Sequence, residues 1–334
     1  MLNAGKSLEL NHNNIINIII NIIDIWRVSL EFAYDLFLIL ISIIYVKIAM
    51  TWRLSAEMKS FHTLAISQRL QAAHNRENFL YPYLVGLIEG DGYFSISKKG
   101  KYLTYELGIE LSIRDVQLIY KIKSLLGVGV VSFRKRKENR NMVILRIRNK
   151  NHLKNIIIPI FDKYPMLSSK QSDYVRFKNN LLSDIKYSSD LLEYTRSNEY
   201  RNPTDMYIDS IISKPYFVAW LVGFIEAEGC FSIYNIGKMK NYTVASFDIS
   251  QKDAYILLFA INKYLSFSPS IYKDKSNCFR IKVTSIRSIE NIIKFLKKAP
   301  VKLMGYKKLQ YILWLKNLRK ITRYSKRIKI PSKY

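Results

Sequence analysis

The feature that most constrains this chain is an internal repeat. Residues 84–92 read LVGLIEGDG, and residues 221–229, which lie 137 positions later, read LVGFIEAEG. A lysine followed four residues later by a tyrosine comes after each copy, at Lys170 and at Lys307, and both lysines lie 79 residues beyond the last acid of their motif. Chance rarely preserves such a spacing, so the sequence predicts a duplication with two pseudo-equivalent halves.

The secondary-structure signals also recur in the same order. After its motif helix, the first half predicts two strands, a helix and two further strands, at 94–97, 102–112, 116–126, 128–133 and 142–147. The second half predicts the same series at 231–236, 242–251, 254–265, 268–273 and 278–284. Helices follow in each half.

A polar stretch over residues 183–215 separates the two halves. It contains a run of Ser188, Ser189 and Asp190 as well as Pro203, and it indicates a linker. We therefore expect four segments along the chain: an apolar N-terminal extension over 1–78, a first domain over 79–185, a linker over 186–214 and a second domain over 215–334.

The net charge points to a polyanionic partner. Lys and Arg number 53 against 26 Asp and Glu, a net charge of +27, and residues 1–78 hold only 7 of the basic residues and 6 of the acidic ones. Such an excess disfavours a compact fold by self-repulsion and is typical of nucleic-acid-binding proteins. On charge alone, a basic ribosomal protein or a membrane-surface protein is an alternative.

Cysteine and histidine usage narrows the choice of metal. The chain has two cysteines, Cys230 and Cys278, and four scattered histidines, which excludes a disulfide framework and a His/Cys zinc cluster. A metal site would have to consist of carboxylates and carbonyls, which suits magnesium or manganese. The abundance of Ile, Lys, Asn, Tyr and Phe fits an A+T-rich, organellar gene.

The N-terminal extension is apolar over residues 13–50. Its uncharged run, residues 36–46, has eleven residues, fewer than the roughly 20 that a spanning helix needs. A span would have to include Asp35 and Glu31. Neither a secretory signal nor an Arg-rich transit peptide is evident. Membrane insertion of this segment and a dispensable leader both stay open.

The repeated motif carries features of a chemical site. Small residues, Gly86 and Gly90 in one copy and Gly223 and Ala227 in the other, would let two helices approach backbone to backbone. Such packing would bring together Asp91 and Glu228, the last acids of the two motifs. A divalent cation, held by these carboxylates and by the carbonyls of Gly90 and Ala227, would relieve their repulsion. The alternative for either acid alone is a solvated helix end followed by a glycine cap.

These motifs and their matching lysines resemble those of the LAGLIDADG homing endonucleases, in particular the monomeric two-motif enzymes encoded in group I introns of fungal mitochondria. The resemblance covers about residues 79–334. It implies an α/β (α+β) pseudo-dimer of two αββαββα domains, with saddle-shaped antiparallel sheets and a central two-helix interface. Some members of the family also act as maturases, which assist splicing of their own intron RNA.

The resemblance also implies roles for individual residues. Asp91 and Glu228 would bind Mg²⁺, for which Mn²⁺ can substitute, and each acid would serve cleavage of one DNA strand. Lys170 and Lys307 match the basic residue that polarises the water network. Gln251 matches a polar residue beside the scissile phosphate, where the first half has Ile113. Glu89 and Glu226 are expected to make structural contacts at the helix interface.

The implied partner is a double-stranded DNA target of about 20 bp, bound by a monomer along the major groove. Candidate DNA contacts are the basic residues of the strands and hairpins: Lys98, Lys101, Arg134, Arg136, Arg146, Arg148, Lys273, Arg280 and Lys282. The expected location is the mitochondrion. Two other classes stay open, a splicing cofactor that binds group I intron RNA and a membrane-tethered basic protein held by residues 13–50.

Overall fold

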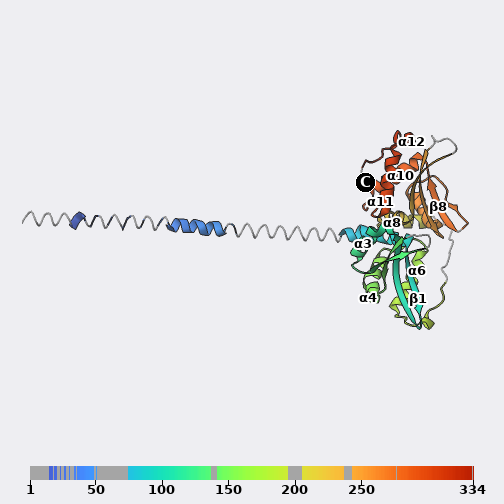
Figure 1. Cartoon of the computed structure of the whole chain (residues 1–334), viewed down its shortest axis with the longest axis horizontal. Helices are drawn as coiled ribbons and strands as arrows, with labels where there is room; N and C mark the ends of the chain where they lie inside the picture. Colours follow the sequence, from blue (N-terminus) through green and yellow to red (C-terminus); the bar gives the residue numbers. More distant parts are fainter. Residues whose placement is uncertain are drawn as a thin grey trace, which may run out of the picture. The chain divides into compact units, whose positions relative to one another are not determined.

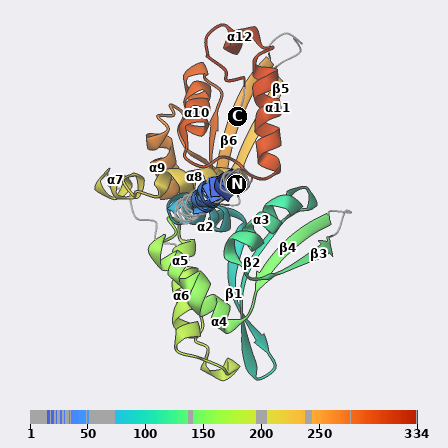
Figure 2. The ribbon, with the colours of Figure 1, turned by 90° about the vertical axis from the view of Figure 1, so that its left-hand side faces the viewer.

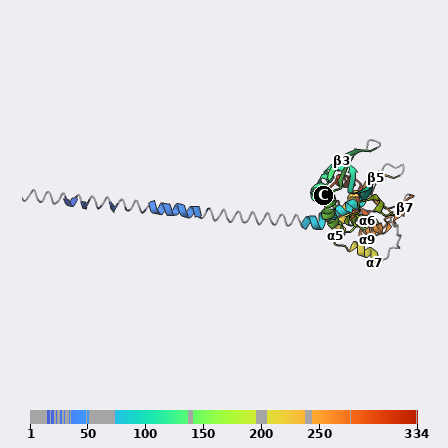
Figure 3. The same cartoon turned by 90° about the horizontal axis from the view of Figure 1, so that it is seen from below.

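The computed structural model describes residues 74–136, 141–194, 205–236, 243–275, 277–332 and 334, with residues 36–48 and scattered others between 15 and 50. The chain forms two compact units, Met1–Ala72 and Ala73–Tyr334. In the first unit, Leu36–Ile48 is an apolar helix with exposed side chains (Figures 1 and 3). The predicted connector over 51–78 falls mostly outside the described residues.

No single helix in the described parts of the chain has both the length and the apolar character of a membrane span. A bent pair, Met206–Ile212 and Phe217–Glu228, meets these criteria only when its two helices are taken together. The second helix of this pair is buried in the core of the larger unit.

The larger unit contains two halves with the same order of elements. The first half comprises η1 (Arg76–Leu80), α2 (Tyr81–Asp91), β1 (Gly92–Lys99), β2 (Tyr102–Ser112), η2 (Ile113–Asp115), α3 (Val116–Leu126), β3 (Val130–Lys135), β4 (Asn141–Ile147), α4 (Lys150–His152), η4 (Leu153–Ile157), α5 (Ile158–Lys163), α6 (Lys170–Leu182) and η5 (Ser188–Asp190). After α7 (Asp205–Ile212), the second half comprises α8 (Phe217–Glu228), β5 (Gly229–Asn235), β6 (Thr243–Lys252), α9 (Tyr255–Tyr264), β7 (Tyr272–Lys273), β8 (Cys278–Val283), α10 (Ile286–Lys298), α11 (Tyr306–Leu318) and α12 (Thr322–Ser325).

Each half builds one four-stranded antiparallel sheet, with strand orders β1-β2-β4-β3 and β5-β6-β8-β7. Figure 2 shows the first half, in cyan to green, and the second half, in yellow to red, meeting at α2 and α8. The predicted fold class, a pseudo-dimer of two mixed α and antiparallel β domains around a two-helix interface, is confirmed.

The predicted strands and helices agree with the structure to within a few residues, with one larger difference. Helix α3 ends at Gly127, whose φ of 70° suits glycine. The strand expected over 268–273 is reduced to Tyr272–Lys273. Pro269 has no N–H to donate to a ladder, and its carbonyl accepts a hydrogen bond from the Asn262 side chain at 3.2 Å.

One face of each sheet packs against helices, and the other is open. Tyr105, Leu107 and Ile109 alternate along β2 as buried residues, and Phe94 of β1 packs its ring against Phe161 with centroids 5.1 Å apart. The residues between them along these strands are mostly polar. Each sheet therefore has a core face and an open polar face, which is the period-2 pattern of a half-buried sheet.

The predicted linker, 186–214, is partly ordered. Its first residues extend the sheet beyond the end of β4: the Leu103 N–H donates to Lys186 O at 2.8 Å, and the Ser188 N–H donates to Lys101 O at 2.9 Å. Helix α7 near its end buries Ile208 and Ile211.

Candidate active site

The two motif helices, α2 and α8, touch backbone to backbone. A Cβ added at Gly86 would lie 2.0 Å from Trp220 O, and one at Gly223 would lie 1.9 Å from Tyr83 O. A Cβ at Gly90 would lie 2.3 Å from the Cβ of Ala227. The four small residues expected at a helix interface therefore lie at this contact, and a side chain on either Gly86 or Gly223 would force the helices apart.

Two buried glutamates on these helices form hydrogen bonds across the interface. Glu89 accepts a bond from the Trp220 indole at 2.8 Å, and Glu226 accepts one from the Tyr83 hydroxyl at 2.9 Å. Tyr83 and Trp220 occupy equivalent positions, six residues before the glutamate of their own motif. The two bonds are thus related by the pseudo-twofold symmetry, and burial raises the pKa of both carboxyls.

The same glutamates fix the loops that precede α6 and α11. Glu89 accepts from the backbone N–H of Leu167 at 2.8 Å and also from that of Ser168, and Glu226 accepts from that of Met304 at 2.7 Å. These loops lead directly into the helices that carry Lys170 and Lys307. Each glutamate therefore joins the helix interface to a lysine, as the sequence led us to expect of a structural contact.

Asp91 and Glu228 come together where α2 and α8 end. A Cβ on Gly90 would lie 3.3 Å from Glu228 Oε1, so the glycine leaves room for that carboxylate. Surrounding protein desolvates Asp91 and raises its pKa to about 6, and burial together with the negative charge of Asp91 raises the pKa of Glu228 to about 7. Asp91 nevertheless keeps access to solvent. The two acids are partly dehydrated and repel each other.

Both predicted lysines reach this pair. Lys170 Nζ donates to Gly92 O at 2.8 Å and to the carbonyls of Ile88 and Gly90 at 3.2 Å each. Lys307 Nζ donates to Gly229 O at 2.5 Å. The positive charges of Lys307 and Lys170 lower the pKa of Asp91 and of Glu228, opposing the effect of burial.

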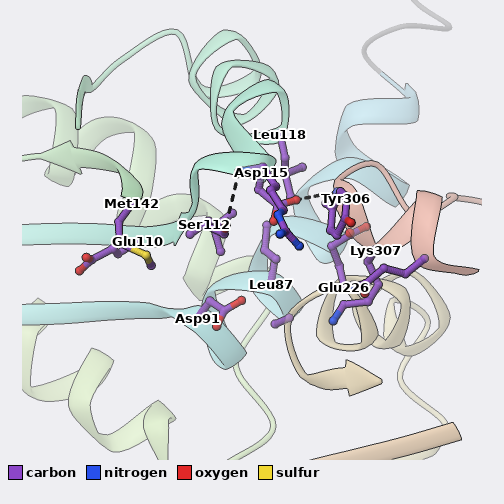
Figure 4. Close-up of a pocket in the computed structure, with 14 residues that line it drawn as sticks. Leu87, Asp91, Glu110, Ser112, Asp115, Leu118, Met142, Glu226, Tyr306 and Lys307 are labelled. Atoms are coloured by element: carbon purple, nitrogen blue, oxygen red, sulfur yellow. Dashed lines mark hydrogen bonds between the residues drawn. The ribbon is translucent and has the colours of Figure 1, made fainter. Parts of the chain in front are cut away.

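A pocket of about 300 Å³ opens beside Asp91 (Figure 4). Lys307 and Glu226 from the second half line it together with Glu110 and Asp115 from the first half. Sequence reasoning did not single out Asp115. The only signal for it was the recurrence of an aspartate after the second strand of each half, at Asp115 and Asp253.

Gln251 also lies at the interface, where its side-chain amide donates to Glu89 O at 3.4 Å. The expected correspondence with Ile113 is wrong. Gly92 pairs with Ile109 and Gly229 pairs with Ile249, which places Leu111 at the position of Gln251. Helix η2 makes the connection to α3 longer than the matching connection to α9, and this explains the shift of two residues. Both Leu111 and Ile113 are apolar, so the two halves still differ here.

The predicted DNA-contact residues divide by sheet face. Strand alternation places six of them on the open faces: Arg134, Arg136, Arg146, Arg148, Arg280 and Lys282. Lys98 instead shares the core side of β1 with Phe94 and Ile96, and Lys273 lies 5.4 Å from the centroid of the buried Phe279 ring. Lys101 lies in the exposed β1–β2 turn.

Acidic residues hold part of the basic set on the first sheet. Arg136 forms an ion pair with Glu110 at 2.7 Å, and Arg148 forms one with Glu106. Glu106 also accepts a 2.6 Å bond from Tyr93. This open face therefore carries an ordered network of donors and acceptors, whereas the second sheet presents Lys282 over the Tyr234 ring at 4.7 Å.

The acid pair fits a divalent cation. Within the described ranges, no group of three or more His, Cys, Asp and Glu side chains is arranged to hold a metal ion. A cation at Asp91 and Glu228 would therefore draw its remaining ligands from carbonyls, water and phosphate oxygens, as magnesium commonly does. The repulsion that raises the pKa of Glu228 is the observation that favours such a cation.

Comparison with known proteins places the chain in a family. The LAGLIDADG endonuclease family model matches residues 84–181 and 221–318, and the chain belongs to this family. It is 32% identical over 254 residues to "Probable intron-encoded endonuclease Cox1-I1b" of Schizosaccharomyces pombe, covering 71% of this chain but only 64% of that protein. It is 30% identical over 223 residues to "Probable intron-encoded endonuclease aI3" of Dictyostelium citrinum, covering 66% of this chain and 88% of that one.

Solved structures share the fold. LAGLIDADG homing endonuclease I-GzeII in complex with its DNA target has a TM-score of 0.58 at 21% identity, covering 75% of this chain and 92% of that one. I-SmaMI bound to an uncleaved DNA target in the presence of calcium ions has a TM-score of 0.56 at 21% identity, covering 75% and 93%.

Proposed function

We propose that this protein is a site-specific homing endonuclease that makes a double-strand break in DNA by metal-dependent phosphodiester hydrolysis and so promotes intron mobility in the mitochondrion. One observation carries the proposal: Asp91 and Glu228 converge, each near a lysine anchored to the backbone, between two sheets with open basic faces. Two domains, 79–185 and 215–334, joined by the linker 186–214, would each supply one half of this site.

In this proposal, Asp91 and Glu228 hold Mg²⁺ or Mn²⁺ with help from the carbonyls of Gly90 and Ala227. Gly90 O already accepts from Lys170, which leaves one lone pair for a cation. When bound, the metal supplies Lewis-acid stabilisation of the charge that develops on the phosphate and lowers the pKa of water.

The lysines and Gln251 would act around that centre. Lys170 and Lys307 are held in place by backbone carbonyls, so their charges stand ready beside the acids without reorganisation. They would stabilise negative charge on the phosphate and orient the attacking water. Gln251 would orient one scissile phosphate, and Leu111 cannot do so in the other half because it has no polar atoms.

The open faces of the sheets would bind the duplex as a monomer over about 20 bp. Arg134, Arg136, Arg146, Arg148, Arg280 and Lys282 lie on these faces and are the favoured contacts. Lys101 at the hairpin tip is placed to reach a phosphate, whereas Lys98 and Lys273 lie on the core sides and are the weakest candidates.

The test is cleavage of a supercoiled plasmid that carries the intronless allele of the host gene, with the full-length protein in Mg²⁺ or in EDTA. We expect linear product with Mg²⁺ and none with EDTA. A second plasmid carries the intron-containing allele, in which the intron interrupts the target, and it should stay uncut. Tight binding of the intron RNA with no cutting of the intronless allele would contradict the proposal and favour a maturase.

A further inference from the structure

The two lysine helices begin differently, although the rest of the site is nearly symmetric. Ser168 and Gly305 occupy matching positions, 137 residues apart. In the first half, Ser168 Oγ accepts a hydrogen bond from the Lys170 N–H at 3.3 Å, which caps α6 from within its own half. Gly305 has no side chain with which to cap α11.

A residue of the first half makes that cap instead. Asp115 Oδ1 accepts a 2.6 Å hydrogen bond from the N–H of Tyr306, the first residue of α11. The Arg114 guanidinium lies 5.1 Å from the centroid of the Tyr306 ring, and Lys121 Nζ donates to Met304 O at 3.5 Å. The start of α3 and the residues before it therefore dock on the start of α11 (Figure 4).

Gly305 is what allows this contact. A Cβ there would lie 2.4 Å from Asp115 Oδ1 and 2.9 Å from Glu226 Oε1. The carboxylate also sits at the positive end of the helix dipole, where an anion is favoured. Burial raises the pKa of Asp115, while the Tyr306 hydrogen bond and the charge of Lys307 lower it.

The second half makes no equivalent use of its own aspartate. Asp253 lies in a turn with φ of 51°, and its N–H donates to Asn277 O at 3.1 Å. Lys307 is the second residue of α11, so the position of the first turn of α11 sets the position of its side chain. The site around Lys307 thus depends on a contact between the halves that the site around Lys170 does not share.

We propose that Asp115 is a positioning residue: it caps α11 across the domain interface and thereby holds Lys307 beside Asp91, so that the two DNA strands differ in their dependence on it. This inference rests on the proposed endonuclease function for its second test but not for its first.

The first test measures hydrogen exchange at the amides of residues 306–309 in the full-length protein. Asp115→Ala should speed exchange about fivefold, because the cap is lost. Asp115→Asn keeps an acceptor oxygen and should stay near the wild type, and Asp253→Asn is the matched control in the second half. Unchanged exchange in Asp115→Ala, or the same acceleration in Asp253→Asn, would overturn the cap.

The second test follows each strand of an end-labelled target that the wild type cuts. Asp115→Ala should change the ratio of the two strand-cleavage rates about tenfold, with duplex binding in EDTA unaffected, because a misplaced Lys307 harms one reaction more than the other. Asp115→Asn should restore the ratio. Equal slowing of both strands would refute the positioning role. A wild type that cuts neither strand contradicts the endonuclease itself, while the exchange result still decides the cap.

Discussion

The Tyr83 hydroxyl donates a 2.9 Å hydrogen bond to Glu226, which lies in the other half of the molecule and 143 positions away in the chain. The mirror bond joins Trp220 to Glu89 at 2.8 Å. Because each glutamate also holds the loop before a lysine helix, the central helices and the outer lysines form one connected structure. Stability and site geometry are therefore coupled through these two bonds.

We expect Tyr83→Phe to lower the free energy of unfolding by about 1–3 kcal/mol, because it removes a buried donor from a carboxylate whose Oε1 already has no hydrogen-bond partner. Urea denaturation measures this. Tyr120→Phe, at an exposed position on α3, is the control and should change stability by less than about 0.5 kcal/mol. Equal effects of the two substitutions would contradict the role given to Glu226.

A methyl group at the helix crossing should be more damaging. Gly86→Ala places a Cβ 2.0 Å from Trp220 O, where only backbone can move, so we expect a loss of about 3 kcal/mol or more. Thermal unfolding of Gly86→Ala beside Gln117→Ala, an exposed α3 position, tests this. A Gly86→Ala protein as stable as the control would show that the helices do not touch as described.

Sequence reasoning identified the duplication, the fold class, the helix contact and the four residues that converge at its end. Those inferences depended on residues whose spacing is fixed by local geometry, such as Gly86 and Gly90 four apart on a helix. It missed Asp115 and the ion pairs of Glu106 and Glu110, because nothing local indicates which side chains two separate domains will bring together. It also placed Ile113 at the position of Gln251, since counting from motifs cannot detect a connection of different length.

Acidity should tune stability in a direction set by the acid pair. Folded-state pKa values of about 6 for Asp91 and about 7 for Glu228 exceed their usual values of 3.8 and 4.5, so between about pH 4 and 7 the folded state binds more protons than the unfolded state. Stability should therefore fall as pH rises through that window in EDTA. The double variant Asp91→Asn, Glu228→Gln should show a flatter curve of Tm against pH. Parallel curves for the two proteins would contradict the raised pKa values.

Loss of one lysine should shift the pH dependence of activity. Of the two lysines, Lys170 has the larger lowering effect on the pKa of Glu228. Lys170→Met should therefore raise that pKa further, so that the acid limb of the cleavage profile moves to higher pH while the maximal rate falls at least about tenfold. Lys316→Met, on the same helix as Lys307 but outside the site, is the control. A lower rate with an unmoved acid limb would show that Lys170 does not act on Glu228.

The central claim is that Asp91 and Glu228 together form the centre of metal-dependent DNA cleavage. Its most direct test compares the wild type, Asp91→Asn, Glu228→Gln and the exposed control Glu193→Gln for Mg²⁺-dependent linearisation of the intronless-allele plasmid, with duplex affinity measured on the same samples. We predict that each acid variant loses at least about a hundredfold in double-strand cleavage while it still binds the duplex, and that Glu193→Gln cuts like the wild type. Linear product from either acid variant at the wild-type rate would contradict the account.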